Sequence, residues 1–438
     1  MKNALTFLLC CSMFHTAQTQ ILDYDISTFV RPELYRSTST IGADINLSND
    51  NNIVDPNTKE TDYSARLNGS YTLTKFVNNE SNQKFLFTFI DLTGAINNNA
   101  NNTQDVDFVD LEFRRNVSNR KFGFSNNQKF FEVSYTIDID AGHYRSSDEN
   151  VNQLGFYWEV PLFMGKGRIE IVNDAWQALR LLDMLEQASF LKKGMSSDEI
   201  NALALEIGRI KNARMTDFRL ERIYEYEWLS KYLVEQGIID PENYAVFSAV
   251  NDVWNFENYN IIRSGKSFKY GLVPFIDYDV NRFLFSNFDN DNTRFGVIAR
   301  IEREVYKPSR NKFSFDYTYG LDLGMYRIDP HGETELSSTL DYYAEPRIRA
   351  TAAYYPSART NYSVSFLTNY NYSIASDDRA FTTNRLSTSI EGFYQYYASP
   401  QLGFTLSGRL ALRNNKNDFS NRTNNTNRLR FSTIYRFF

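Results

Sequence analysis

Apolar and polar residues alternate along the C-terminal part of the chain. Between residues 361 and 374, mostly aromatic and aliphatic residues occupy every second position, and Asn and Ser occupy nearly all the positions between them; Leu367 is the one exception. Successive side chains of a β-strand point to opposite faces, so this pattern predicts a strand with one apolar and one polar face. The alternation recurs over residues 312–326, 385–396 and 403–413.

The length of these segments separates two kinds of sheet. A soluble antiparallel sheet also alternates, but its strands are mostly about five or six residues long. A tilted strand that crosses a bilayer needs about ten residues. The long segments therefore favour a sheet whose apolar face lies against lipid.

Similar segments occur in the N-terminal half of the chain. Six are expected there, over residues 35–47, 63–76, 84–96, 106–115, 131–144 and 154–172. About eight more run from residue 268 to the end, which gives about fourteen, an even number as in single-chain bacterial barrels. The predicted fold is an all-β, transmembrane, antiparallel up-and-down β-barrel with an inserted α-helical domain. It should close between its first and last strands, because lipid cannot satisfy an open sheet edge.

The connections between the C-terminal segments fall into two alternating classes. Short turns containing Pro occur at 307–310, 355–358 and 399–401, and mostly longer segments rich in Asn or Asp occur at 287–293, 329–335, 375–379 and 414–427. A membrane meander predicts this alternation, with short turns at the periplasmic rim and longer polar loops outside. Tyr354 and Tyr396 face outward beside two short turns, where an aromatic belt is expected. The insert follows the sixth predicted strand, which ends on the side of the short turns, so the insert is expected on the periplasmic side.

Between residues 173 and 255 the apolar period changes from two to about 3.6, which predicts helices. Asn173 or Asp174 can cap the first helix, and Gly194 is expected at its end. Ser196 and Glu199 form a predicted capping box for the second. The four apolar stripes are Trp176, Leu179, Leu182 and Leu185; Ile200, Leu203, Ile207 and Ile210; Leu220, Ile223, Tyr226, Leu229 and Leu233; and Tyr244, Phe247 and Trp254.

Two further sequence features predict where the third helix ends and where the fourth begins. Gly237 is expected to stop the third, and Asp240 with Pro241 should supply the cap and first turn of the fourth. The stripes require burial against each other or against the barrel. The insert is therefore expected to plug or brace the barrel, to gate it, or to offer a docking surface.

The N-terminus reads as a secretory signal over residues 1–20, with Lys2 before an apolar core. Both cysteines, Cys10 and Cys11, lie in this segment, so the mature chain is expected to lack thiols and disulfides. The predicted organisation is a signal peptide over 1–20, barrel strands over 21–172, the helical insert over 173–255 and barrel strands over 256–438. No apolar run of about 18 residues occurs, which argues against a helical membrane span.

The inward faces of the predicted strands are rich in charge. The candidate lumen-lining residues are Arg300, Glu302, Glu345, Arg347, Arg349, Arg385, Glu391, Arg409, Arg413, Arg428 and Arg430. They can form a charged constriction that selects solutes, and the arginines of the last two strands suggest a wall that attracts anions. The alternative is that these residues pair with each other and brace the wall, since any barrel lumen is polar.

Little in the sequence indicates an enzyme. His143 is expected to point toward lipid and His331 to lie in a loop, so neither is placed for proton transfer beside a nucleophile. No catalytic residue, cofactor site or metal site is predicted from the motifs. A net charge of −6 with mixed signs argues against a nucleic-acid binder.

The signal, the alternating strands, the two classes of connection and the aromatic C-terminus together resemble bacterial outer-membrane β-barrel proteins. Residues 425–438 carry the closest match, since Leu429, Phe431, Tyr435 and Phe437 share one face and Phe438 is terminal on the other. The resemblance implies an integral location in the Gram-negative outer membrane, in contact with the bilayer and lipopolysaccharide. It also implies recognition of the C-terminal strand by the barrel-assembly machinery.

The expected function is a non-enzymatic pore or transporter for a hydrophilic solute or an exported polymer. The helical insert is expected to gate or plug the pore, or to dock a periplasmic protein partner. A sealed structural or assembly subunit of an outer-membrane complex is the first alternative. An outer-membrane hydrolase is the second.

Overall fold

The computed structural model divides the chain into two compact units, a strand unit (30–172 and 261–438) and a helical unit (1–29 and 173–260). The structure describes residues 24–30, 33–55, 58–98, 106–123, 128–145, 150–212, 218–241, 244–256, 261–283, 290–309, 312–331, 339–375, 382–399, 402–417 and 421–435. The predicted signal segment, both cysteines and the last three residues lie outside this set.

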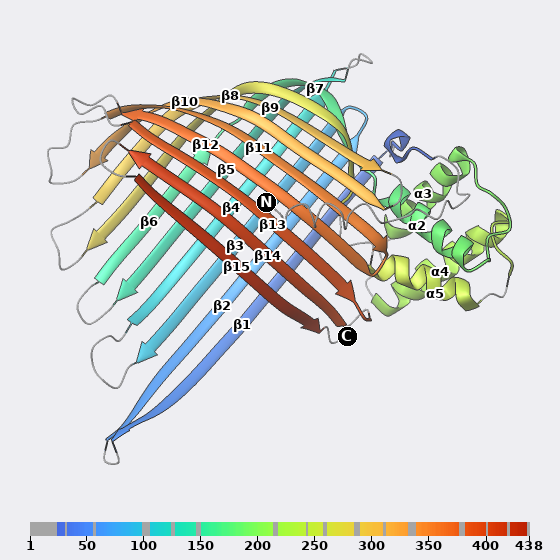
Figure 1. Cartoon of the computed structure of the whole chain (residues 1–438), viewed down its shortest axis with the longest axis horizontal. Coiled ribbons are helices and arrows are strands. Elements are labelled where there is room, and N and C mark those ends of the chain that lie inside the picture. Colours follow the sequence, from blue (N-terminus) through green and yellow to red (C-terminus); the bar gives the residue numbers. More distant parts are fainter. Residues whose placement is uncertain are drawn as a thin grey trace, which may run out of the picture. The chain divides into compact units, whose positions relative to one another are not determined.

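The strand unit is one antiparallel up-and-down sheet, in which neighbours along the chain are neighbours in space (Figure 1). Its strands are β1 (Glu33–Asp55), β2 (Thr58–Asn79), β3 (Asn82–Asn98), β4 (Val106–Phe122), β5 (Lys129–Arg145), β6 (Asn150–Glu159), β7 (Leu162–Ile171), β8 (Arg263–Phe283), β9 (Asn290–Ser309), β10 (Phe313–His331), β11 (Thr339–Ser357), β12 (Thr360–Ala375), β13 (Thr382–Tyr397), β14 (Leu402–Asn417) and β15 (Asn421–Tyr435). This confirms the predicted β-barrel fold with a helical insert between β7 and β8. Within the described residues no register pair joins β1 to β15, so closure at that seam stays a prediction.

The predicted ribbon at 154–172 is two strands, β6 and β7, with a break at Val160 and Pro161. Pro161 has no N–H to give to a ladder, and its carbonyl instead accepts from the Ser134 N–H at 2.9 Å. Each of the two strands pairs with β5 on one side and β8 on the other, so together they fill one position in the sheet. The pairing path therefore has fourteen positions, six before the helices and eight after, as predicted.

The two faces of β10 differ as the alternation predicted. Its outward face carries Phe313, Phe315, Tyr317, Tyr319, Leu323 and Met325, which are all between 37% and 50% exposed. Ser314 and Asp322, on the opposite face, are both 5% exposed. Large exposed apolar side chains in a continuous row are what a lipid-facing barrel surface presents, and a soluble sheet rarely does.

An aromatic row crosses the outward face beside the short turns. Phe313 stacks on Tyr354 with ring centroids 4.5 Å apart, and Tyr354 lies 6.3 Å from Tyr362. Tyr362 in turn lies 4.9 Å from Tyr394. Tyr396, two residues further along β13, is 38% exposed. The row is what an interfacial aromatic belt requires.

Two of the predicted long loops are shorter than expected. The segment 414–427 is mostly strand, because Asn414 pairs with Thr423 and Lys416 with Asn421, leaving only 418–420 between β14 and β15. In the same way β10 extends to His331. A strand ladder uses backbone groups, so a change to Asn-rich composition marks the end of the apolar face and not the end of the pairing.

The helical unit contains η2 (Ile26–Thr28), α2 (Asn173–Gln187), α3 (Ser197–Asn212), α4 (Phe218–Glu235) and α5 (Tyr244–Phe256). Helix α2 packs against α3 and α5. The short segment 24–29 also belongs to this unit, which its sequence did not suggest: Ile26 and Phe29 are buried, and the Tyr24 hydroxyl donates to Asn201 Oδ1 at 2.5 Å. Burial, with the nearby charge of Asp25, raises the pKa of Tyr24 to about 12. None of the described helices is long and apolar enough to cross a membrane.

The predicted capping box of α3 is confirmed. The Ser196 N–H donates to Glu199 Oε2 at 2.8 Å, and the Glu199 N–H donates to Ser196 Oγ at 3.3 Å. A hydrogen bond from Lys193, followed by those from Ser196, lowers the pKa of Glu199 to about 2. The predicted stripe of this helix is buried, since Ile200, Leu203, Ile207 and Ile210 are at most 2% exposed.

Helix ends were predicted less well. Helix α2 ends at Gln187, earlier than the predicted end at Gly194. Ser189, and not Gly194, adopts the left-handed conformation that ends the helix, with φ 61°. The Phe190 N–H donates to the Leu185 carbonyl at 2.8 Å. The stop at Gly237 (φ 65°) is confirmed.

One expectation about the last two helices is wrong and one stays a prediction. Residues 242 and 243, just before α5, lie outside the described set, so the cap and first turn at Asp240 and Pro241 stay a prediction; Asp240 pairs with Lys192. Ile223, predicted on the buried stripe of α4, is 54% exposed, whereas Leu229 and Leu233 are fully buried. The side chains of Leu220, Tyr244 and Phe247 lie outside the described set.

Candidate functional site

A chain of ion pairs runs across the inward face of the sheet from β4 to β11. At one end Glu132, on β5, accepts from Arg120 on β4, with an N–O distance of 2.7 Å. Lys269, on β8, lies 3.9 Å from Glu132 and 3.1 Å from Glu302 on β9. Ser118 also donates to Glu132 at 3.2 Å.

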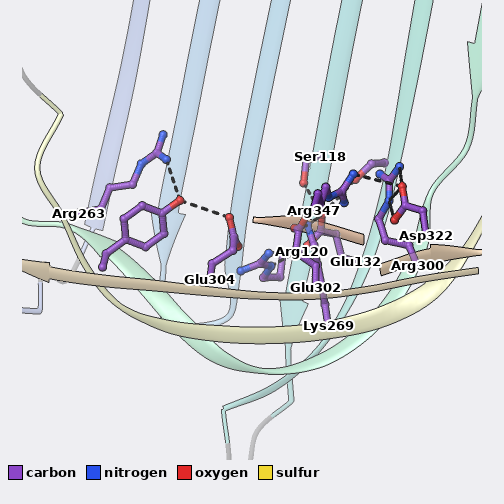
Figure 2. A network of polar contacts seen from close by, with 12 residues as sticks. Ser118, Arg120, Glu132, Arg263, Lys269, Arg300, Glu302, Glu304, Asp322 and Arg347 are labelled. Atoms are coloured by element: carbon purple, nitrogen blue, oxygen red, sulfur yellow. Dashed lines mark hydrogen bonds and ion pairs between the residues drawn. The ribbon is translucent and has the colours of Figure 1, made fainter. Parts of the chain in front are cut away.

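The chain continues through β10 and β11 (Figure 2). Arg347, on β11, contacts both Glu302 at 2.8 Å and Asp322 at 3.2 Å. Asp322 also pairs with Arg300, on β9, at 2.9 Å. Residues from six strands are therefore joined through shared carboxylates.

Strand register explains why these side chains meet. Asp322 on β10 lies directly opposite Arg300 on β9, and Lys269 on β8 lies opposite Glu302. Gly320 is the cross-strand partner of both Glu302 and Arg347. Because Gly320 has no side chain, Arg347 can extend over β10 and reach Glu302. A Cβ at this glycine would lie 3.4 Å from Arg347 Nε.

The acids of this network are well shielded. Glu132, Asp322 and Glu302 have side chains only 6%, 7% and 14% exposed. Shielded charges are tolerated only when they are paired and hydrogen-bonded, and removing one partner is costly. In this sector the geometry supports the interpretation that the charges pair and brace the wall.

The candidate residues on the last strands form a different group. Arg409 on β14 lies opposite Glu391 on β13 and opposite Arg428 on β15, and Ser407 lies opposite Arg430. Arg409, Arg413, Arg428 and Arg430 are all exposed. The described part of the chain provides no ion pair for any of these four, so their charge faces solvent. We call these four residues the arginine wall.

The remaining candidates lie between the two groups. Glu345 accepts from the side-chain amides of Asn369 at 3.3 Å and Asn371 at 3.0 Å. Arg385 lies opposite Asn371 and lines a small cavity with Glu345. Arg349 lies opposite Thr318 on the inward face of β11. The eleven predicted residues therefore share one face of the sheet but do not form one cluster, and their role in lining a lumen stays a prediction.

Sequence reasoning named no candidate lumen-lining residue before Arg300. Arg120, Glu132 and Lys269 were therefore missed. Four aspartates that share a small cavity, Asp138, Asp140, Asp277 and Asp279, were missed as a group as well. Alternation identifies the inward face of a strand but gives no register between strands, which is what brings these residues together.

Of the histidine side chains, the structure describes that of His143. His143 is exposed, and its Nδ1 lies 2.7 Å from Asn152 Oδ1 on the neighbouring strand. The side chain of His331 lies outside the described residues.

Comparisons with known proteins give little. No family model matches the chain, and no curated protein matches it. A solved structure titled "CymD monoaromatic hydrocarbon channel" aligns with 92% of this chain and 88% of its own, at 9% identity and a TM-score of 0.23. A likeness this weak supports no conclusion about function.

Proposed function

We propose that this protein is an integral outer-membrane β-barrel that moves a hydrophilic solute or polymer through its lumen without chemical catalysis. The observation that carries the proposal is the contrast between the two faces of β14. Leu410 on its outward face is 58% exposed, and the neighbouring Arg409 on its inward face is exposed as well. An exposed leucine row fits lipid, whereas an exposed arginine row requires water.

The arginine wall places positive charge along one side of the proposed lumen. Unpaired cations along an aqueous path attract anions and repel cations. Glu391, directly opposite Arg409, reduces this field. We therefore expect a modest preference for anionic solutes.

The partners we propose follow from this location. The outward face contacts the bilayer and lipopolysaccharide, and the C-terminal strand is the segment that the barrel-assembly machinery would recognise. The helical unit is inserted at the strand ends that bear the short turns, which we assign to the periplasmic side. There it gates or plugs the lumen, or docks a periplasmic protein.

A sealed structural subunit is the second candidate. The ion-pair network from Arg120 to Arg300 favours it, because mutually paired charges brace a wall without offering free charge to a solute. The two candidates differ in one property, the passage of ions.

Conductance in planar bilayers separates them. We expect the full chain to form channels, and a variant lacking residues 174–254 to conduct more if the helical unit gates or plugs the lumen. Heat-modifiable migration on a gel must show that both forms are folded. Folded protein that conducts in neither form would refute the transport proposal and favour the sealed subunit. Lipase or protease activity in the purified protein would instead revive the hydrolase.

A further inference from the structure

The strand unit contains a cavity of ≈630 Å³ near its short-turn end. Inward side chains of strands β2 to β5 and β7 to β9 line it. Its apolar lining residues are Phe76, Phe85, Ile169, Ile171 and Ile261.

The end of β7 forms one side of this cavity. Arg168 donates to the carbonyl oxygens of Asn79 at 2.7 Å and Glu80 at 2.8 Å, and Gln83 Nε2 donates to the Ile169 carbonyl at 2.7 Å. The turn between β2 and β3 is not a sheet neighbour of β7, so these bonds cross the inward side of the wall. They hold Ile169 and Ile171 opposite the phenylalanines of β2 and β3.

The apolar lining is unusual for a barrel interior, which is ordinarily polar. Phe85 is 39% exposed and Ile261 is 56% exposed, although both line the cavity. Large apolar side chains that stay accessible in a concave site are the usual lining of a ligand pocket. An apolar group of a ligand would remove this surface from water.

The polar lining of the cavity carries the cations Lys84, Arg120, Arg263 and Lys269 and the acids Glu132 and Glu304. Arg120 and Lys269 both share Glu132, as described above. Arg263 is exposed, lies over the ring of Tyr306 at 5.4 Å and donates to the Tyr306 hydroxyl at 3.3 Å. Figure 2 shows Arg263 at one end of the row, where the Tyr306 hydroxyl lies between it and Glu304 and donates to Glu304 at 3.3 Å. Over the described ranges no carboxylate lies within ion-pair distance of its guanidinium.

We propose that this cavity binds an amphipathic monocarboxylate, with its apolar tail between the β7 end and the phenylalanines and its carboxylate at Arg263. A guanidinium with free donors suits a carboxylate, which it can bind through two parallel hydrogen bonds. The lining carries four cations and two acids, so its net positive charge disfavours a cationic head group. The ligand is amphipathic and so differs from the hydrophilic solute of the proposed function; the inference goes beyond that function and does not depend on transport.

Equilibrium binding of radiolabelled decanoate tests the proposal. The full chain is placed in lipid nanodiscs, and binding to empty nanodiscs is subtracted. We expect saturable binding that Arg263→Gln weakens by about tenfold, the effect of losing one charge-assisted hydrogen bond. Arg263→Lys should restore part of the loss, and decanol binding should be unchanged in both variants.

Two further variants separate the site from the rest of the lumen. Phe85→Ser should weaken both decanoate and decanol, whereas Arg430→Gln, on the arginine wall, should change neither. Heat-modifiable migration confirms that each variant is folded.

Absence of saturable decanoate binding to the wild-type chain would overturn the proposal, as would equal binding of decyltrimethylammonium or no effect of Arg263→Gln. The outcome is independent of conductance. A chain that conducts without binding decanoate refutes only the cavity, and one that binds without conducting refutes only transport.

Discussion

Arg347 is the residue on which the ion-pair network depends most, because it joins two acids, Glu302 and Asp322. Arg347→Met leaves both acids short of a partner in a shielded site, so we expect a loss of about 2–3 kcal/mol in the free energy of unfolding, less than for a fully buried pair. Arg327→Met is the matched control. Arg327 is 51% exposed and, among the described residues, has Asp329 as its one ion-pair partner, so its loss should cost less than about 1 kcal/mol. Denaturant unfolding followed by gel mobility measures both, and equal costs would contradict the role given to the network.

The arginine wall permits a prediction about selectivity. Replacing two of its charges, in Arg409→Ser with Arg430→Ser, should shift the reversal potential in a salt gradient toward cations and leave folding nearly intact. Leu410→Arg is the control on the opposite face, where a charge in mid-bilayer costs roughly 2–4 kcal/mol and should impair assembly. A double variant that fails to fold, beside a silent Leu410→Arg, would mean that inside and outside are reversed.

At the scale of elements, Gly167 holds a backbone conformation within β7 that only glycine adopts readily. Its φ of 104° is unfavourable for other residues, and a Cβ there would collide with the Lys266 carbonyl oxygen. Gly167→Ala should therefore destabilise the strand unit by about 1–3 kcal/mol. Gly69→Ala on β2, where a Cβ would meet nothing within 4 Å, is the control. If both variants unfold at the same denaturant concentration, the backbone at Gly167 is not a constrained feature.

Elements and contacts differ in how far the sequence determines them. Period-two alternation was sufficient to find every strand position, because burial on one face acts on each strand separately. It did not reveal the break at Pro161 or the left-handed Ser189, which depend on local hydrogen bonds. The partners of Glu132 and Lys269 depend on the register between strands distant in sequence, so the ion-pair network could not be derived from any one segment.

At the scale of the whole molecule, the sidedness of the barrel can be tested on intact cells. Cysteine introduced at Asn417, at the end of β14 far from the short turns, should react with an impermeant thiol reagent. Cysteine at Ser197, the first residue of α3, should react only after the outer membrane is permeabilised. The reverse pattern would place the helical unit outside the cell and shift the strand count by one.

The central claim is that one face of each strand lies in lipid and the other in water. Single cysteines placed in turn from residue 315 to residue 323 of β10 test it most directly, in protein reconstituted into liposomes. Fluorophores at Phe315, Tyr317, Tyr319 and Leu323 should be quenched by brominated lipid chains, and cysteines at Asp316 and Thr318 should react with a water-soluble thiol reagent. A period of two between the two signals is the predicted result. Uniform reactivity along the strand, or quenching at the aspartates, would contradict the account.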